Sequence, residues 1–199
     1  MICSVFLFTA CEKEDYWGED VAINGNSGLI MASPYYIEAT IEGKKREFKD
    51  GREGFRNRFG SFGATIDGLG TFFEKQKVIF EGNQNFEVYF MERFLDPPGK
   101  KEIEQMFRKG EYKFGNSYAN SPGVEITYTD NQGRVWSTAK GSAMQINSKF
   151  NVINHYSNHF DAYTPFITEA TFSCVLYDGN GNSMEVSNGR VVARTVVYE

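Results

Sequence analysis

The sequence predicts an all-β domain: an antiparallel β-sandwich of about ten strands with one short helix, or alternatively a closed β-barrel. Three observations predict this fold class. The 199 residues include 18 Phe, 11 Tyr and 20 Gly, which is typical of strands joined by glycine turns. Apolar and polar residues alternate with a period of two in many short segments. Only one segment shows helical spacing, and a chain of this length can bury one core, which we expect over residues 34–199.

The first predicted strand begins at Tyr36, where Ile37, Ala39 and Ile41 share one face. A turn at Gly43 then leads into a second strand, which predicts a β-hairpin. Four further short strands are expected at residues 59–66, 71–73, 78–80 and 86–90.

A single helix is expected after the Pro-rich interruption at residues 96–99. Ile103, Met106 and Phe107 fall at positions i, i+3 and i+4, as on one face of a helix. Gly110 stands where a left-handed cap would end such a helix.

The second half of the chain predicts two hairpins of similar design. In both, an alternating strand ends in an Asp-to-Gly turn, at residues 130–133 and 178–181. Asp and Asn side chains bond the local backbone there, while Gly supplies a positive φ. A further turn is expected at residues 187–189, followed by a final strand over residues 191–198.

The N-terminus predicts export and lipid attachment. Residues 2–10 read ICSVFLFTA, an uncharged apolar segment too short to span a bilayer, so residues 1–10 are expected to be the remnant of a signal peptide. Cys11 follows directly and is the expected site of lipidation, where several acyl chains would anchor the protein stably. Residues 11–33 then form the lipidated cysteine and a flexible tether. Cys174 is left without a cysteine partner, so no disulfide is expected.

Two parts of the chain resemble a known group of proteins. The run at residues 8–11 resembles a lipobox, and the acidic start of the mature chain resembles the export signal of Bacteroidota lipoproteins. That signal would comprise Glu12, Lys13, Glu14 and Asp15. Residues 170–174, 177–181 and 186–191 resemble the closing strands of small Bacteroidota outer-membrane or surface lipoproteins with a β-sandwich domain. The resemblance implies a lipid-anchored, surface-exposed location and brings no catalytic residues.

No catalytic residue, cofactor or metal site is predicted. His155 and His159 stand four residues apart, but the segment lacks the glutamate of the metalloprotease helix. The turn at Asp178 lacks the bidentate glutamate of a calcium loop. A formal net charge of −5 without a basic excess argues against nucleic acid as a partner.

A long connection is predicted between Phe150 and Phe166, and it is the first candidate for a ligand site. Sugars stack on aromatic rings while their hydroxyls bond polar side chains, so this composition could line a glycan site. The alternative is that the rings pack the end of the sandwich. The candidate residues are His155, Tyr156, His159, Phe160, Asp161 and Tyr163.

A basic stretch is the second candidate, either as a solvated hairpin face or as a patch for anionic glycans or lipid headgroups. It comprises Lys44, Lys45, Arg46, Arg52, Arg56 and Arg58.

Together these features predict a membrane-anchored binding or interaction module, with a glycan or an envelope protein as partner. A structural role, as an adhesin-like or fimbrial accessory subunit, is the alternative and would need exposed sheet edges. A glycan hydrolase is the third hypothesis and would need two facing carboxylates in a groove.

Overall fold

The structure is a computed structural model that describes residues 33–66, 71–157 and 166–195. Every described residue belongs to one compact unit, Met31–Glu199. The expectations for the signal remnant, for Cys11, for the export signal and for most of the tether therefore lie outside the described residues.

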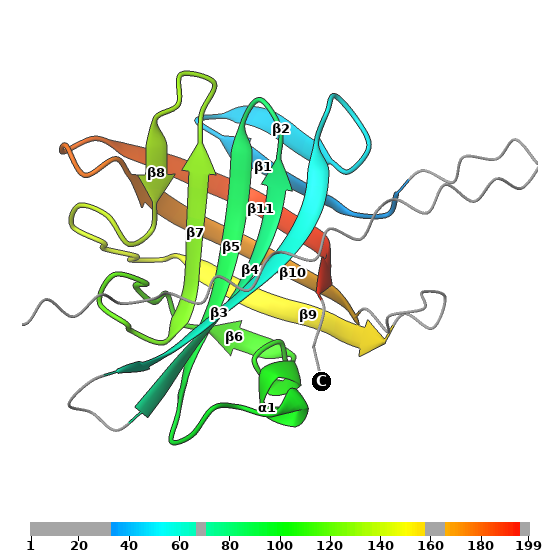
Figure 1. Ribbon diagram of the computed structural model, residues 1–199. Helices are drawn as coiled ribbons and strands as arrows, with labels where there is room; N and C mark the ends of the chain where they lie inside the picture. The colour runs from blue at the N-terminus through cyan, green and yellow to red at the C-terminus, as the bar shows by residue number, and fades with distance from the viewer. Residues whose placement is uncertain (1–32, 67–70, 158–165, 196–199) are drawn as a thin grey trace, which may run out of the picture. The chain divides into compact units, whose positions relative to one another are not determined.

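The described residues form eleven strands and one short helix (Figure 1), which confirms the predicted all-β fold class. The elements are β1 (Tyr36–Ile41), β2 (Lys44–Lys49), β3 (Arg56–Ile66), β4 (Thr71–Glu81), β5 (Asn85–Phe94), α1 (Lys100–Gln105), β6 (Gly110–Tyr112), β7 (Gly123–Thr129), β8 (Val135–Ser137), β9 (Lys149–Ser157), β10 (Phe166–Tyr177) and β11 (Ser183–Thr195).

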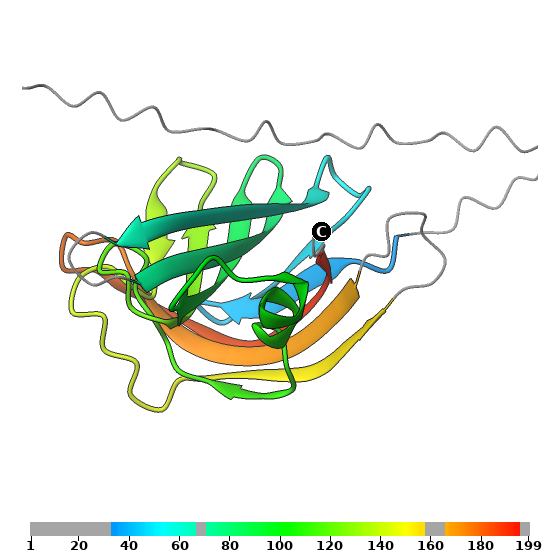
Figure 2. The ribbon, with the colours of Figure 1, turned by 60° about the horizontal axis from the view of Figure 1, so that its bottom comes forward.

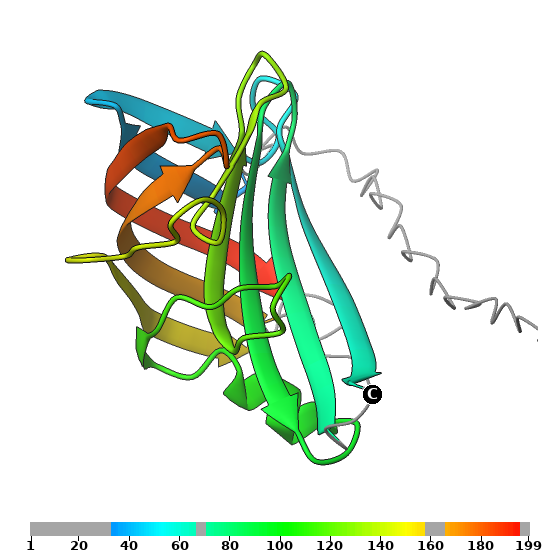
Figure 3. The same ribbon diagram turned by 90° about the vertical axis from the view of Figure 1, so that its left-hand side faces the viewer.

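All named strands pair antiparallel in one sheet, in the order β2-β1-β11-β10-β8-β7-β5-β4-β3. The sheet branches at β10, which pairs with β9 near its start and with β8 through Tyr177 near its end; β6 then pairs with β9. Figure 3 shows two facing layers, β3-β4-β5-β7 and β1-β11-β10-β9, whose strands cross in Figure 1. Among the described residues no ladder joins β2 to β3, so the sheet curls into a sandwich without closing.

The two layers enclose a core in which aromatic rings contact one another in an unbroken series. Neighbouring ring centroids lie between 4.8 and 6.1 Å apart. The series runs through Phe55, Phe48, Phe86, Phe172, Phe150, Phe90, Phe107, His155 and Phe166. Because these rings come from both layers, this aromatic column holds the layers together.

The helix is shorter than predicted. It ends at Gln105 with Met106 as its C-cap, and Gly110, at φ 136°, begins β6 instead of ending the helix. The reason is packing: Phe107 is fully buried, and its ring contacts Phe59 of β3 and Phe90 of β5. Figure 2 shows α1 at one end of the sandwich, between the layers.

The predicted turn at residues 187–189 is wrong, because β11 runs on through it. At this point β11 carries one more residue than β10, and the surplus forms a β-bulge. Asn188 adopts a φ of 51°, and the register with β10 shifts between Phe172 and Cys174. Gly189 pairs with Phe172, and a Cβ at Gly189 would lie 2.4 Å from that ring. A glycine at this position therefore lets the central ring of the aromatic column lie against the backbone of β11.

One asparagine links the layers where the sheet does not close. Asn57, at the start of β3, donates from Nδ2 to the carbonyl of Ile79 (3.3 Å) and accepts the backbone N–H of Arg194 at its Oδ1 (3.0 Å). Its own N–H donates to Asp50 Oδ1 (2.9 Å) in the segment after β2. The side chain thus joins β3 and β4 to the end of β11 with hydrogen bonds that a ladder would otherwise supply.

We expect Asn57→Ala to lower the free energy of unfolding by about 1–3 kcal/mol, because two side-chain hydrogen bonds are lost and the Arg194 N–H loses its acceptor. Urea unfolding measures the change. Asn83→Ala, at an exposed turn, is the matched control and should stay within about 0.5 kcal/mol of the unsubstituted protein. Equal effects of the two substitutions would show that Asn57 does not link the layers.

Candidate functional site

The predicted loop from Phe150 to Phe166 is largely a strand. Residues up to Ser157 form β9, which pairs with β10, and only residues 158–165 fall outside the described chain at this point. The loop prediction was wrong because Phe150 and Val152 alternate inward between polar residues and are both buried. His159, Phe160, Asp161 and Tyr163 lie outside the described residues.

The two described members of the predicted ligand site, His155 and Tyr156, lie on opposite faces of β9. His155 points into the sandwich, where its ring stacks between Phe107 (5.4 Å) and Phe166 (4.9 Å). Its Nδ1 lies 2.9 Å from Thr168 Oγ1, whereas its Nε2 is buried without a hydrogen-bond partner among the described residues. Burial lowers the pKa of His155 to about 4, so the ring is neutral at pH 7. Tyr156 is 47% exposed on the outer face.

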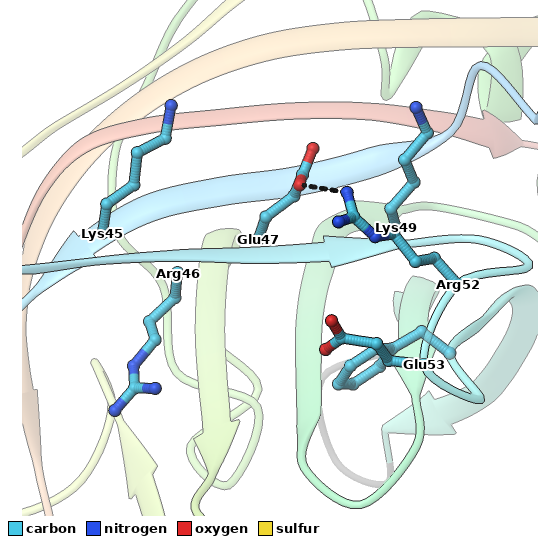
Figure 4. Close-up of a pocket in the computed structure, with 7 residues that line it drawn as sticks. Lys45, Arg46, Glu47, Lys49, Arg52 and Glu53 are labelled. Atoms are coloured by element: carbon cyan, nitrogen blue, oxygen red, sulfur yellow. Dashed lines mark hydrogen bonds and ion pairs between the residues drawn. The ribbon is translucent and has the colours of Figure 1, made fainter.

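Residues of the predicted basic stretch form separate ion pairs with carboxylates. Lys45 pairs with Glu38 of β1 at 2.9 Å and Arg52 with Glu47 at 3.3 Å. Figure 4 shows Lys45 and Glu47 rising from one side of β2 and Arg46 from the other. The side chains of this hairpin surround a hollow of about 230 Å³.

The remaining basic residues are also separated from one another. Arg58 pairs with Glu81 across β3 and β4 at 3.0 Å. Lys44 begins β2 and Arg56 begins β3, and both are exposed.

A polar row that we did not single out in the sequence crosses the outer face of the second layer. Strand register places one residue from each of six neighbouring strands in line. In strand order from β2 to β6 these are Glu47, Glu38, Arg190, Thr171, Asn151 and Glu111. Because residues in register point to the same side of a sheet, this row forms a continuous polar surface.

A shallow hollow of about 760 Å³ follows this row, and we call it the outer groove. It lies over the bulge of β11 at Asn188. Its lining residues are Glu38, Glu111, Lys149, Asn151, Thr171, Phe172, Ser173, Asn188, Gly189 and Arg190. The lining combines hydrogen-bond donors and acceptors, which suits a ligand carrying many hydroxyl groups.

Ion pairs and a ring hold the charged groups of the outer groove in place. The Arg190 guanidinium lies 3.7 Å from Glu169 and 5.9 Å from the ring centroid of Tyr36. Glu38, at the other side of Arg190 in the row, is held by Lys45. Such pairing fixes side-chain orientation before a ligand arrives and reduces the entropy lost on binding.

The two carboxylates that line the outer groove are too far apart for glycoside hydrolysis. Glu38 on β1 and Glu111 on β6 are separated by four strand spacings, roughly 19 Å at about 4.8 Å each. Hydrolases place their two carboxyl groups about 5–9.5 Å apart. The groove geometry therefore favours binding over hydrolysis.

Cys174 is a core residue. It is 3% exposed, and burial raises the pKa of its thiol, so the thiolate that a nucleophile requires is disfavoured. In the part of the chain that the structure describes, no group of three or more His, Cys, Asp or Glu side chains could hold a metal ion. The same residues include no helix long and apolar enough to cross a membrane.

Comparison of the chain with protein-family models, with curated proteins and with solved structures found no match. The functional interpretation therefore rests on geometry and chemistry.

The sequence did contain a signal for the outer groove. Glu38, Asn151 and Thr171 are polar positions in strands whose other face is apolar, and that alternation predicts exposure. It does not reveal that they align, because alignment depends on the pairing of strands distant in sequence.

We predict that His155 makes the fold sensitive to acid. Its folded pKa of about 4 lies below the ordinary value of 6.5, so the unfolded chain takes up more protons between these values and stability falls as the pH falls. His155→Phe removes this term, so its unfolding free energy should decline less than that of the unsubstituted protein between pH 7 and pH 4.5. Urea unfolding across that range tests the difference, and NMR titration reports the pKa directly. A measured pKa near 6.5 would contradict the buried position.

Proposed function

We propose that this protein is a lipid-anchored binding module of the bacterial outer membrane, exposed at the cell surface, that binds a glycan in the outer groove. The observation that carries the proposal is the row of polar side chains from five neighbouring strands, β1 to β6 in sheet order, along one hollow. The membrane attachment through Cys11 is inferred from the sequence alone.

The chemistry of the groove supports a glycan over an apolar ligand. A sugar hydroxyl both donates and accepts a hydrogen bond. It is matched by a donor beside an acceptor, as with Arg190 and Glu38, and by groups that do both, such as Asn151 and Thr171. The residues that line the groove extend across five neighbouring strands, from β1 to β6. An extended oligosaccharide would fit that geometry.

A structural role is the second candidate function, and the edge of the sheet favours it. β3 is eleven residues long, and within the described residues it pairs with β4 alone. A free edge of this length could accept a strand from another subunit. Concentration-dependent assembly that β3 substitutions abolish, in the absence of glycan binding, would favour this role over ours.

The binding proposal predicts that Arg190→Ala/Asn151→Ala weakens glycan binding at least tenfold. The variant removes a donor and a planar amide from the middle of the row, and hot-spot groups of this kind contribute about 1–3 kcal/mol each. A glycan array of residues 12–199 identifies the ligand, and calorimetric titration measures the affinity.

The matched control is Arg108→Ala/Asn180→Ala, which removes the same residue types from exposed positions that do not line the groove. It should bind as the unsubstituted protein does. Equal binding by the groove variant, with an unchanged unfolding midpoint, would exclude the groove as the site.

If a lipid on Cys11 anchors the protein, Cys11→Ala should move the protein from the membrane fraction to the soluble fraction. The lipid would be attached through the Cys11 thiol, and a single apolar segment of this length does not hold a protein in a bilayer. Ultracentrifugation of lysed cells and mass spectrometry of the mature N-terminus are the measurements. An unmodified Cys11 on membrane-bound protein contradicts lipidation.

A further inference from the structure

The outer face of the other layer carries a cluster of rings and ammonium groups that the outer groove does not include. Phe62 lies on β3, Lys75 and Lys77 on β4, and Tyr89 on β5. We call these four residues the aromatic–lysine face. Register pairs Phe62 with Lys75 and Lys77 with Tyr89, so all four side chains project from the same side of the sheet.

The lysines of this face are held against rings. Lys75 Nζ lies 5.5 Å from the ring centroid of Phe62 and 5.3 Å from that of Tyr89, and Lys77 Nζ lies 5.7 Å from Tyr89. An ammonium group over a ring face is attracted by the ring quadrupole but keeps its charge. The two positive charges are thereby brought close to one ring.

These lysines differ from Lys45 and Arg52 of the basic stretch, each of which forms an ion pair with a carboxylate. Within the described chain neither Lys75 nor Lys77 makes an ion pair. Two carboxylates do lie near Tyr89 and help to raise its pKa, but each accepts hydrogen bonds from neutral groups: Glu87 from the Tyr89 hydroxyl, and Glu125 from Ser137 Oγ and the Ser117 N–H. The face therefore presents positive charge that a ligand can use.

The face also offers an accessible ring and open space beside it. Phe62 is 57% exposed, which is unusual for a phenylalanine on a strand. Gly60 pairs with Lys77, and the one atom near an added Cβ there is Lys77 Cε, at 4.0 Å. Gly60 therefore leaves the space directly beside Lys77 open on the β3 side.

We propose that the aromatic–lysine face binds an acidic glycan, with a uronate carboxylate at Lys75 and Lys77 and the apolar face of a sugar ring on Phe62. Charge complementarity selects the acidic ligand, because neither lysine makes an ion pair with a carboxylate of the described residues. The exposed ring selects a sugar, since its C–H face stacks on an aromatic surface in the way that ring faces generally pack. This site is separate from the outer groove and does not depend on it.

The test is calorimetric titration of residues 12–199 with oligogalacturonate and oligoglucuronate at low salt. The methyl ester of each oligosaccharide serves as a probe that keeps the sugar ring and removes the charge. We expect the acid forms to bind at least tenfold more tightly than the esters, and their affinity to fall as salt is added. Lys75→Gln/Lys77→Gln should reduce binding of the acid forms at least tenfold.

Lys100→Gln/Lys101→Gln is the matched control, because it removes the same charge from exposed positions on α1. It should bind the acid forms as the unsubstituted protein does. A second pair of variants addresses the ring independently of charge: Phe62→Ala should weaken binding severalfold and Phe62→Tyr should retain it. Arg190→Ala/Asn151→Ala should leave binding at this face unchanged, which separates it from the outer groove.

Three results would overturn the proposal. The first is equal affinity for acid and ester, and the second is unchanged binding in both the lysine variant and Phe62→Ala. The third is no binding of either acid oligosaccharide, including the case in which vesicles of anionic phospholipid bind in their place.

Discussion

The aromatic column is the interaction on which the rest of the structure depends. Phe86 of β5 contacts Phe48 of β2 and Phe172 of β10 in the facing layer, and Phe90 of β5 contacts Phe150 of β9 in the same way. Removing any of these rings would leave a large cavity, because protein interiors are close-packed and relax only partly. The column also occupies the space between the layers. Packed side chains therefore fill the interior of this sandwich, and the residues that bind a ligand have to lie on its outer faces.

Some polar side chains do lie in the interior. They lie either away from the aromatic column or between two of its rings. Glu74 and Gln76 lie on the inner side of β4 and bond each other, and Ser61 Oγ donates to Glu74 at 3.1 Å. Burial raises the pKa of Glu74, while Gln76 Oε1 has no hydrogen-bond partner. His155 is likewise a polar side chain among apolar groups. Its ring stacks between two aromatic rings, and among the described residues Thr168 is its one hydrogen-bond partner. These groups reduce stability compared with an apolar core, and each is kept neutral or satisfied by near neighbours.

The outer faces of the two layers differ in how their charges are balanced. On the layer with the outer groove, acidic and basic side chains pair across neighbouring strands, as Lys45 does with Glu38 and Arg190 with Glu169. On the opposite layer Arg58 pairs with Glu81, but Lys75 and Lys77 lie over rings and make no ion pair among the described residues. A surface whose charged side chains form ion pairs suits a ligand that is polar but uncharged, whereas a lysine without an ion pair suits an anionic ligand. The contrast leads us to assign ligands of different charge to the two faces.

The sequence predicted the parts of the fold that depend on local pattern. Ile37 and Ile41 alternate inward as expected. In the Asp-to-Gly turn at Asp178, the backbone N–H groups of Asn180 and Asn182 donate to Asp178 Oδ1, as predicted. Prediction from the sequence failed where tertiary packing outweighs the local pattern. Asn188 has turn chemistry but forms a bulge, because β1 and β10 pair with β11 on both sides of it.

The candidate sites were harder to predict than the fold. The pairing of Glu38 with Arg190 joins the first strand to the last, and no local pattern specifies that register. Lys75 and Phe62 are similarly unremarkable in sequence, and only the pairing of β3 with β4 brings them together. The predicted loop after Phe150 was misread for a related reason: its polar residues are the outer side of a strand.

The central claim is that the interior is filled and that ligands bind on the outer faces of the sheet. NMR spectra of residues 12–199, recorded while a glycan identified on the array is added, test this claim most directly. We expect shift changes at the amides of Thr171 and Arg190, with the ring signals of Phe150 and Phe172 unchanged. Large changes in those two rings without changes at the outer amides would place the ligand inside the sandwich and contradict the account.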